Sequence, residues 1–322
     1  MFFPANENQT ILDAALSNNI NLEYSCSNGR CGRCKALLLE GSIEETSFSL
    51  EDTLLPGEIL TCCSVPKEDL LLKANYSPEL SNIKRKTFPS KVDTISYLSQ
   101  DVIQLILRLP ETANFEFLPG QYLDLNWMGN KRSYSIASAD ASNNRVELHI
   151  KKVEKGLFSN FLFNELTPGQ LLRFYGPLGT FFIRDSNSPL IFLCTGTGFA
   201  PVKSIVERLL TSKVSRKISI YWGGRTLDDL YSDLPKLWAE QYEHVQYVPV
   251  LSRDTHYSEN SPNTSSQKKY VQDVALREHQ NLHEFEVYAC GSDQMIKTAR
   301  QLFIKKGLNP ENFYSDAFLQ SN

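Results

Sequence analysis

The sequence lacks the features that would place this chain in a membrane or on a nucleic acid. No stretch approaches the roughly 18 consecutive apolar residues that a membrane-spanning helix requires. The first residues show no basic segment followed by an apolar core, so we expect no secretory signal. The formal net charge of −4 gives no basic footprint of the kind that binds nucleic acid. We therefore expect a cytoplasmic protein with no membrane insertion and no nucleic-acid partner.

Cysteine is sparse and unevenly placed. The 322 residues include seven cysteines, an odd number, and four of them are spaced like metal ligands. This distribution favours metal binding in a reducing compartment over a set of disulfides. The length of the chain predicts two or three domains.

Three of these cysteines, Cys26, Cys31 and Cys34, form a C-x4-C-x2-C run, which is the spacing of plant-type [2Fe–2S] proteins. Gly29 and Gly32 lie within the run and allow a loop tight enough to bring several thiolates to two irons. Zinc sites usually show two C-x2-C pairs, and this sequence has one. A zinc site and buried structural thiols are the alternatives to an iron–sulfur cluster.

Residues 5–74 resemble a plant-type ferredoxin domain, which implies an α+β fold of the β-grasp type. The resemblance also implies a fourth ligand farther along the chain, where Cys62 and Cys63 are adjacent. The apolar segment that leads into Cys62 resembles the lead-in to the last cysteine of that family. It implies that Cys62 binds the cluster and that Cys63 is a packed neighbour.

The next domain has the period of β-strands. Short alternating apolar runs separated by turn residues predict an antiparallel β-barrel. The runs cover residues 103–109, 123–127 and 146–150.

Four polar residues in one predicted strand of this barrel, Arg132, Ser133, Tyr134 and Ser135, suit a flavin. Arginine pairs with a pyrophosphate, tyrosine offers a flat face to the isoalloxazine ring, and a serine hydroxyl can hydrogen-bond near the reactive nitrogen. Farther along, Gly156 and Ser159 open a predicted helix over residues 157–165. The N-terminus of such a helix suits a phosphate.

The last domain alternates strands and helices, which predicts a doubly wound α/β domain with a parallel sheet. Gly196, Thr197 and Gly198 lie between a continuous apolar strand and a predicted helix that has Pro201 in its first turn. The glycines allow backbone N–H groups to reach a pyrophosphate. Predicted strands cover 190–194, 218–222, 245–251 and 285–290, and predicted helices cover about 227–242 and 293–306.

Four motifs in this order, Arg-x-Tyr-Ser, Gly-x-x-Ser, Gly-Pro-x-Gly-x-Phe and Gly-Thr-Gly-x-Ala-Pro, resemble the ferredoxin–NADP reductase superfamily. The resemblance implies FAD in the barrel and a nicotinamide dinucleotide in the last domain. It places Cys290 and Gly291 beside the nicotinamide, Arg225 at the adenosine end, and Phe318 near the flavin. It gives catalytic roles to Ser135, Cys290 and Phe318.

The loop at Arg225 bears on the choice of coenzyme. Asp228 and Asp229 follow closely and would repel the 2′-phosphate of NADPH, and no second basic residue is near. We expect NADH, with NADPH less favoured.

These observations predict a chain of three domains. Their expected bounds are 1–74 for the ferredoxin domain, 75–90 for a linker, 91–185 for the FAD-binding barrel and 186–322 for the NAD-binding domain. Within the first domain we expect a short helix over residues 11–16, with Thr10 as its N-cap.

Nearly the whole chain resembles the CDP-6-deoxy-Δ3,4-glucoseen reductase family. In that family, electrons pass from NADH through FAD and a [2Fe–2S] cluster to a pyridoxamine-phosphate-dependent dehydrase that carries a sugar nucleotide. The pathway makes 3,6-dideoxyhexoses for surface polysaccharides such as lipopolysaccharide. The segments that carry the resemblance are residues 12–20, 23–26, 60–64, 76–80, 158–166 and 314–318.

Two other functions are open. The reductase component of a ring-hydroxylating or other oxygenase has the same order of domains. A redox or iron sensor is the third hypothesis, but a sensor needs no hydride site. The five histidines form no ligand spacing, and we assign them no role.

Overall fold

The computed structural model describes residues 1–322 except 30, 47–53, 213–214, 254–269 and 319–322. Contacts between residues divide the chain into two units. The first unit is Met1–Lys84 together with Ser315–Asn322, and the second is Arg85–Tyr314. None of the helices among the described residues is long and apolar enough to cross a bilayer.

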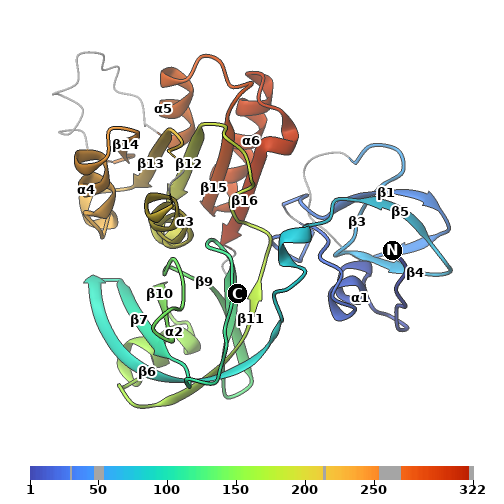
Figure 1. The fold of residues 1–322 in the computed structure, drawn as a ribbon, viewed down its shortest axis with the longest axis horizontal. Coiled ribbons are helices and arrows are strands. Elements are labelled where there is room, and N and C mark those ends of the chain that lie inside the picture. Colours follow the sequence, from blue (N-terminus) through green and yellow to red (C-terminus); the bar gives the residue numbers. More distant parts are fainter. Residues whose placement is uncertain (30, 47–53, 213–214, 254–269, 319–322) are drawn as a thin grey trace. The chain divides into compact units, whose positions relative to one another are not determined.

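The first unit has the β-grasp arrangement of one helix on a small sheet (Figure 1). Helix α1 (Ile11–Ser17) begins where expected, because the Thr10 hydroxyl accepts the Asp13 N–H at 3.1 Å and caps it. Its apolar side chains pack with Ile59 and Leu60 in one core. Strands β3 (Glu58–Leu60), β1 (Lys35–Glu40) and β5 (Leu71–Ala74) form one antiparallel sheet, and β2 (Ile43–Glu45) pairs with β4 (Ser64–Pro66).

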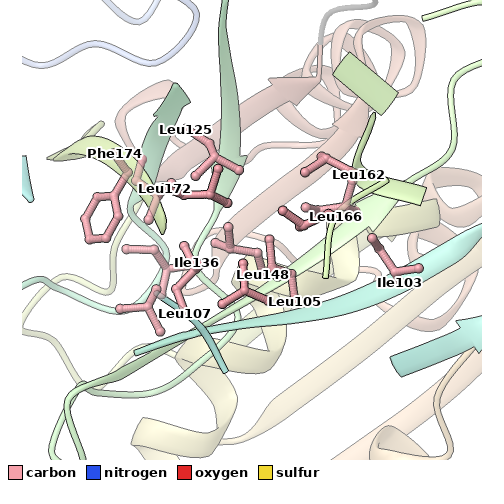
Figure 2. Packing of buried hydrophobic residues seen from close by; sticks show 14 of the residues in the cluster. Ile103, Leu105, Leu107, Leu125, Ile136, Leu148, Leu162, Leu166, Leu172 and Phe174 are labelled. Atoms are coloured by element: carbon pink, nitrogen blue, oxygen red, sulfur yellow. The ribbon is translucent and has the colours of Figure 1, made fainter. Parts of the chain in front are cut away.

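The second unit begins with an antiparallel barrel of six strands in the order β10-β7-β6-β11-β8-β9. An isolated bridge between Ile136 and Leu148 joins the two outer strands and closes the ring. Apolar residues at alternate positions fill the interior, where Ile103, Leu105 and Leu107 of one strand lie together (Figure 2). The strands are β6 (Lys86–Ser99), β7 (Val102–Arg108), β8 (Tyr122–Trp127), β9 (Asn130–Ser135), β10 (Arg145–Lys151) and β11 (Leu171–Leu178).

The nucleotide-binding part has a five-stranded sheet in the order β14-β13-β12-β15-β16. Strand β12 pairs with β13 and β15, and β13 pairs with β14, all in parallel, as the alternation of strands and helices predicts. Helix α3 packs on β12 and β15, and α5 packs on β12, β13 and α6 (Figure 1). The elements are β12 (Leu190–Thr195), β13 (Ile218–Gly224), β14 (Val245–Leu251), β15 (Glu286–Ser292), β16 (Phe313–Phe318), α3 (Phe199–Thr211), α4 (Leu234–Gln241), α5 (Val271–Glu278) and α6 (Asp293–Lys305).

Two expectations about these elements were wrong. The helix expected over 227–242 is a short 3₁₀ turn, η3 (Leu227–Asp229), followed by α4, because Thr226 and Asp229 form a capping box and Pro235 suits a new helix start. The expected linker also contains the first residues of β6. Pro89 is tolerated in that strand, where it lies opposite Arg173.

The end of the chain also differs from the expected bounds. Residues 186–322 were expected to form one domain, whereas contacts group Ser315–Asn322 with the first unit. In that unit the hydroxyl of Ser25, next to Cys26, lies 3.2 Å from a carboxylate oxygen of Asp316. A contact between residues 291 positions apart in the sequence gives no local signal.

Candidate cofactor and active site

The cysteine loop of the first unit brings Cys26 near Cys31, and it brings Cys34 near Cys62. The Cys31 N–H donates to the Cys26 sulfur at 3.3 Å, and the Cys34 and Cys62 sulfurs lie 3.2 Å apart. Gly29 and Gly32 have φ of 72° and 71°, so the loop uses the left-handed conformation that glycine adopts without strain. None of the seven cysteines forms a disulfide.

Within this loop the paired thiols differ in acidity. The hydrogen bond between the Cys34 and Cys62 sulfurs lowers the pKa of Cys34 and raises that of Cys62. A hydrogen bond between the side chains of Cys31 and Cys26, followed by burial, raises the pKa of Cys31. Among the described residues, no group of three or more ligands is placed to hold a single metal ion. A two-iron cluster needs two thiolates on each iron.

Strand β9 carries the predicted flavin residues. Its pairing with β8 places Tyr134 opposite Leu123 and Ser135 opposite Tyr122. Ser135 is buried, while Tyr134 is half-buried and lies 6.2 Å from the Phe158 ring of α2 (Leu157–Asn164). Burial raises the pKa of Tyr134, so its hydroxyl stays protonated.

The two remaining residues of this motif have partners within the hairpin. The Ser133 hydroxyl donates to Asp124 at 2.7 Å, and the Arg132 guanidinium donates to the Lys131 carbonyl at 2.8 Å. Arg132 is half-buried and keeps further N–H donors for an anion.

Helix α2 begins at Leu157 with Gly156 as its N-cap, and no side chain caps it. Its first backbone N–H groups therefore suit a phosphate. The buried Ser159 hydroxyl accepts the Val153 N–H at 2.8 Å and so braces the loop before the helix. Tyr134 and the start of α2 are neighbours, and the structure thus brings two of the predicted flavin motifs together.

The glycine turn after β12 forms a second cradle. Gly196 has φ of 53°, and a β-carbon at this position would meet nothing within 4 Å. The turn is therefore open on the side of Gly196, as a dinucleotide requires. A β-carbon at Gly198 would instead lie 2.7 Å from the Cys290 carbonyl carbon, so the turn packs directly on the end of β15. Pro201 is buried in the first turn of α3.

The end of β15 is fixed by Thr195. The Ser292 N–H donates to the Thr195 hydroxyl at 3.1 Å. Gly291 has φ of 132°, and a β-carbon there would lie 2.9 Å from the Thr195 carbonyl oxygen, so only glycine fits. The Cys290 side chain is fully buried. Phe318 ends β16, and its side chain lies outside the described part of the chain, so its expected role stays a prediction.

The loop after β13 carries the predicted adenosine contact. The backbone N–H groups of Arg225 and Thr226 donate to one carboxylate oxygen of Asp229, at 2.7 and 3.1 Å. Both Arg225 and Asp228 are exposed. Asp229 therefore shapes the loop, and Asp228 carries the acidic charge at its surface.

Comparisons with known proteins cover all three parts of the chain. Residues 1–67 match the 2Fe-2S iron-sulfur cluster binding domain, 89–183 the oxidoreductase FAD-binding domain, and 192–301 the oxidoreductase NAD-binding domain. The CDP-6-deoxy-L-threo-D-glycero-4-hexulose-3-dehydrase reductase of Yersinia pestis is 47% identical over 100% of this chain and 96% of that protein. The chain belongs to this dehydrase reductase family.

More distant relatives of the dehydrase reductase family have the same architecture. Reductase component 1 of the terephthalate 1,2-dioxygenase of a Comamonas species is 34% identical over 99% of this chain and 95% of that protein. The crystal structure of an Amycolatopsis cytochrome P450 reductase has a TM-score of 0.76 and 25% identity, and covers 98% of this chain and 96% of that one. This member of the family is an NAD(P)H-dependent oxidoreductase with binding domains for FAD, NAD(P) and a [2Fe–2S] cluster.

We assigned no role to the histidines from the sequence, yet His149 lies in a buried polar cluster of the structure. Its two ring nitrogens contact Glu147 at 2.8 Å and Tyr231 at 3.0 Å. The only sequence signal was a charged or polar residue at positions 147 and 149 of an apolar strand. Its partners are distant in the sequence, so no local pattern predicts them.

Proposed function

We propose that this reductase takes electrons in pairs from NADH and passes them singly to a pyridoxamine-phosphate-dependent sugar dehydrase, in the synthesis of a 3,6-dideoxyhexose. One observation carries the proposal. The likeness to the Yersinia pestis reductase extends over the whole chain at 47% identity, against 34% for the dioxygenase reductase component. When bound, FAD accepts a hydride and releases single electrons, and the cluster carries those electrons onward.

We assign the cluster to Cys26, Cys31, Cys34 and Cys62. The Cys34 and Cys62 sulfurs lie 3.2 Å apart, the Cys31 N–H donates to the Cys26 sulfur, and each pair of residues suits one iron. Cys63 contacts the Cys62 sulfur at 3.5 Å and serves as a packed neighbour. Cysteines that form no disulfide are typical of a reducing compartment, which supports a cytoplasmic location.

We assign the flavin to the face of the barrel where β9 meets α2. Arg132 and the uncapped start of α2, at Gly156, offer donors to the pyrophosphate. Tyr134 offers its ring to the isoalloxazine, and Ser135 offers a hydroxyl. Ser133 acts through the β8–β9 hairpin that it holds in place, and Ser159 acts through the loop before α2.

We assign the nucleotide to the turn at Gly196, Thr197 and Gly198, next to Cys290 and Gly291. Ligands of parallel sheets bind at the carboxyl ends of the strands, where both turns lie. The exposed carboxylate of Asp228 near Arg225 supports NADH over NADPH, because it would repel a 2′-phosphate.

The identity of the acceptor is tested by competition between two candidates. The purified protein is reduced with NADH without oxygen and mixed with either the substrate-loaded dehydrase or an oxygenase component. We expect the dehydrase to reoxidise the cluster, which is followed by the cluster absorbance. The rate should saturate as the dehydrase concentration rises. Reoxidation by the oxygenase component alone would replace our proposal with the oxygenase alternative.

A further inference from the structure

A buried polar cluster joins the flavin barrel to the nucleotide-binding part of the second unit. We call it the Glu147 cluster. Strand β10 contributes Glu147 and His149, and α3 contributes Lys203. Its members are Gln104, Glu147, His149, Lys203, Glu207 and Tyr231.

The ammonium group of Lys203 is fully used within this cluster. Its Nζ donates to Glu147 at 2.9 Å, to Glu207 at 3.0 Å and to the Ala137 carbonyl at 3.2 Å. A lysine has three N–H donors, so each finds an acceptor. The side chain is only 9% exposed, which makes this a buried charge held by the barrel on one side and by α3 on the other.

The contacts of His149 fix its protonation. Glu147 also receives hydrogen bonds from Lys203 and Gln104, so it is an ionised carboxylate that can only accept. The Nε2 of His149 must therefore carry the proton that it donates to Glu147 at 2.8 Å. Its Nδ1 is then free to accept the Tyr231 hydroxyl at 3.0 Å.

Tyr231 extends the cluster to the glycine turn. Its ring meets the Trp222 ring edge-on, with centroids 5.0 Å apart, and Trp222 stacks on Phe199 at 4.2 Å. The indole Nε1 of Trp222 donates to the Gly196 carbonyl at 3.1 Å. An unbroken set of contacts thus runs from His149 in the barrel to the first glycine of the dinucleotide turn.

We propose that His149, Tyr231 and Lys203 are positioning residues for hydride transfer, because they hold the dinucleotide turn at a fixed place relative to the flavin barrel. This inference rests on the NADH-to-flavin step of the proposed function. Transfer between two bound groups is very sensitive to their placement, and a displacement of 1 Å can cost on the order of 100-fold in rate. The cluster acts on the rate of transfer and leaves the affinity for the nucleotide largely unchanged.

The chain offers a matched control for this idea. Tyr221 also donates to a carboxylate, Glu278, at 2.7 Å and contacts a histidine, His279, at 2.9 Å. Both partners belong to the end of α5, so this second set lies within the nucleotide-binding part alone. Tyr231→Phe and Tyr221→Phe each remove one buried hydroxyl, and only the first breaks a contact with the barrel.

The test measures flavin reduction by NADH in rapid-mixing experiments, with the intact holoprotein. We expect Tyr231→Phe and His149→Gln to lower the limiting rate about tenfold, with the dissociation constant of NAD⁺ changed less than about twofold. Tyr221→Phe should keep the wild-type rate. Equal losses in Tyr231→Phe and Tyr221→Phe, or a loss confined to NAD⁺ affinity, would overturn the proposal.

A second measurement does not depend on turnover. Hydrogen exchange of the backbone, followed by mass spectrometry, should rise at residues 195–203 in Tyr231→Phe and not in Tyr221→Phe. Unchanged exchange there in Tyr231→Phe would also contradict the inference. If the wild-type protein fails to reduce its flavin with NADH at all, the proposed function itself is wrong, and that result is distinct from these.

Discussion

Gly198 lies directly against the carbonyl group of Cys290. A β-carbon at position 198 would come within 2.7 Å of the Cys290 carbonyl carbon and 3.0 Å of the Gly291 Cα, and still closer to the Cys290 oxygen. These are backbone atoms, so they cannot turn aside as a flexible side chain would. The turn after β12 and the turn after β15 therefore hold each other in place at the edge of the sheet where the nucleotide is expected.

Gly198→Ala should weaken NAD⁺ binding at least tenfold, because the two turns must separate to admit the methyl group. Calorimetric titration with NAD⁺ measures this loss, and the flavin and cluster absorbance should stay at wild-type levels. Gly129→Ala is the control: its φ of 80° makes the substitution strained, but the added β-carbon meets nothing within 4 Å, so NAD⁺ affinity should stay at the wild-type level. Wild-type affinity in Gly198→Ala would show that the turns are not coupled.

Cys62→Ser should abolish the cluster and leave flavin reduction by NADH intact. The Cys62 sulfur lies 3.2 Å from that of Cys34, where a fourth thiolate is needed. Cys63→Ser should retain the cluster. Visible absorbance and electron paramagnetic resonance of the dithionite-reduced proteins distinguish the two variants. Loss of the cluster in Cys63→Ser and its retention in Cys62→Ser would reverse our ligand assignment.

The Glu147 cluster should make the second unit less stable in acid. Burial lowers the pKa of His149 below its ordinary 6.5, despite the opposing effect of Glu147, so the folded protein favours the neutral ring. The contribution of His149 to the free energy of unfolding is present above pH 6.5. It is lost as the pH falls toward the lowered pKa of the folded protein, by at most about 1.4 kcal/mol per pH unit.

Thermal release of the flavin, followed by fluorescence between pH 7.5 and 5.5, tests this dependence. The release temperature of the wild type should fall more steeply below pH 6.5 than that of His149→Gln. Parallel curves would mean that His149 does not titrate with unfolding.

Glu147 contributes stability that is lost in a lower pH range. Burial would raise its pKa, but the His149 hydrogen bond and the Lys203 charge lower it to about 2, so its contribution is lost only as the pH falls from 4.5 toward 2.

Asp228→Ser should improve the use of NADPH. Removing one exposed carboxylate near the expected 2′-phosphate relieves a repulsion of about 1 kcal/mol, which corresponds to roughly fivefold in KM for NADPH. The KM for NADH should change little. Asp229→Ser should impair both coenzymes, because that carboxylate holds the loop through Arg225 and Thr226. An unchanged coenzyme ratio in Asp228→Ser would remove the electrostatic basis for preferring NADH.

Local signals predicted much of this architecture. The Thr10 cap, the alternating residues of β7 and the continuous apolar strand before Gly196 each depend on neighbours in the sequence, and the structure shows each element in place. The prediction of one helix over 227–242 was wrong, because a capping box at Thr226 and Asp229 forms a separate short turn and a new helix starts with Pro235 in its first turn.

Contacts between distant segments could not be predicted in this way. His149 lies 82 positions from Tyr231, and Glu147 lies 56 positions from Lys203. Each of these residues has an ordinary local setting, a polar position in a strand or a lysine in a helix. Only the packing of the barrel on α3 makes them one buried cluster.

In the proposed relay, one chain splits electron pairs from NADH and sends them out through its cluster. The most direct measurement mixes the anaerobic holoprotein with one equivalent of NADH and follows flavin and cluster absorbance separately, in the wild type and in Cys62→Ser, with the substrate-loaded dehydrase present. We predict flavin reduction in both proteins, and cluster reduction and dehydrase turnover in the wild type alone. Dehydrase turnover by Cys62→Ser at the wild-type rate, without a cluster, would contradict the account.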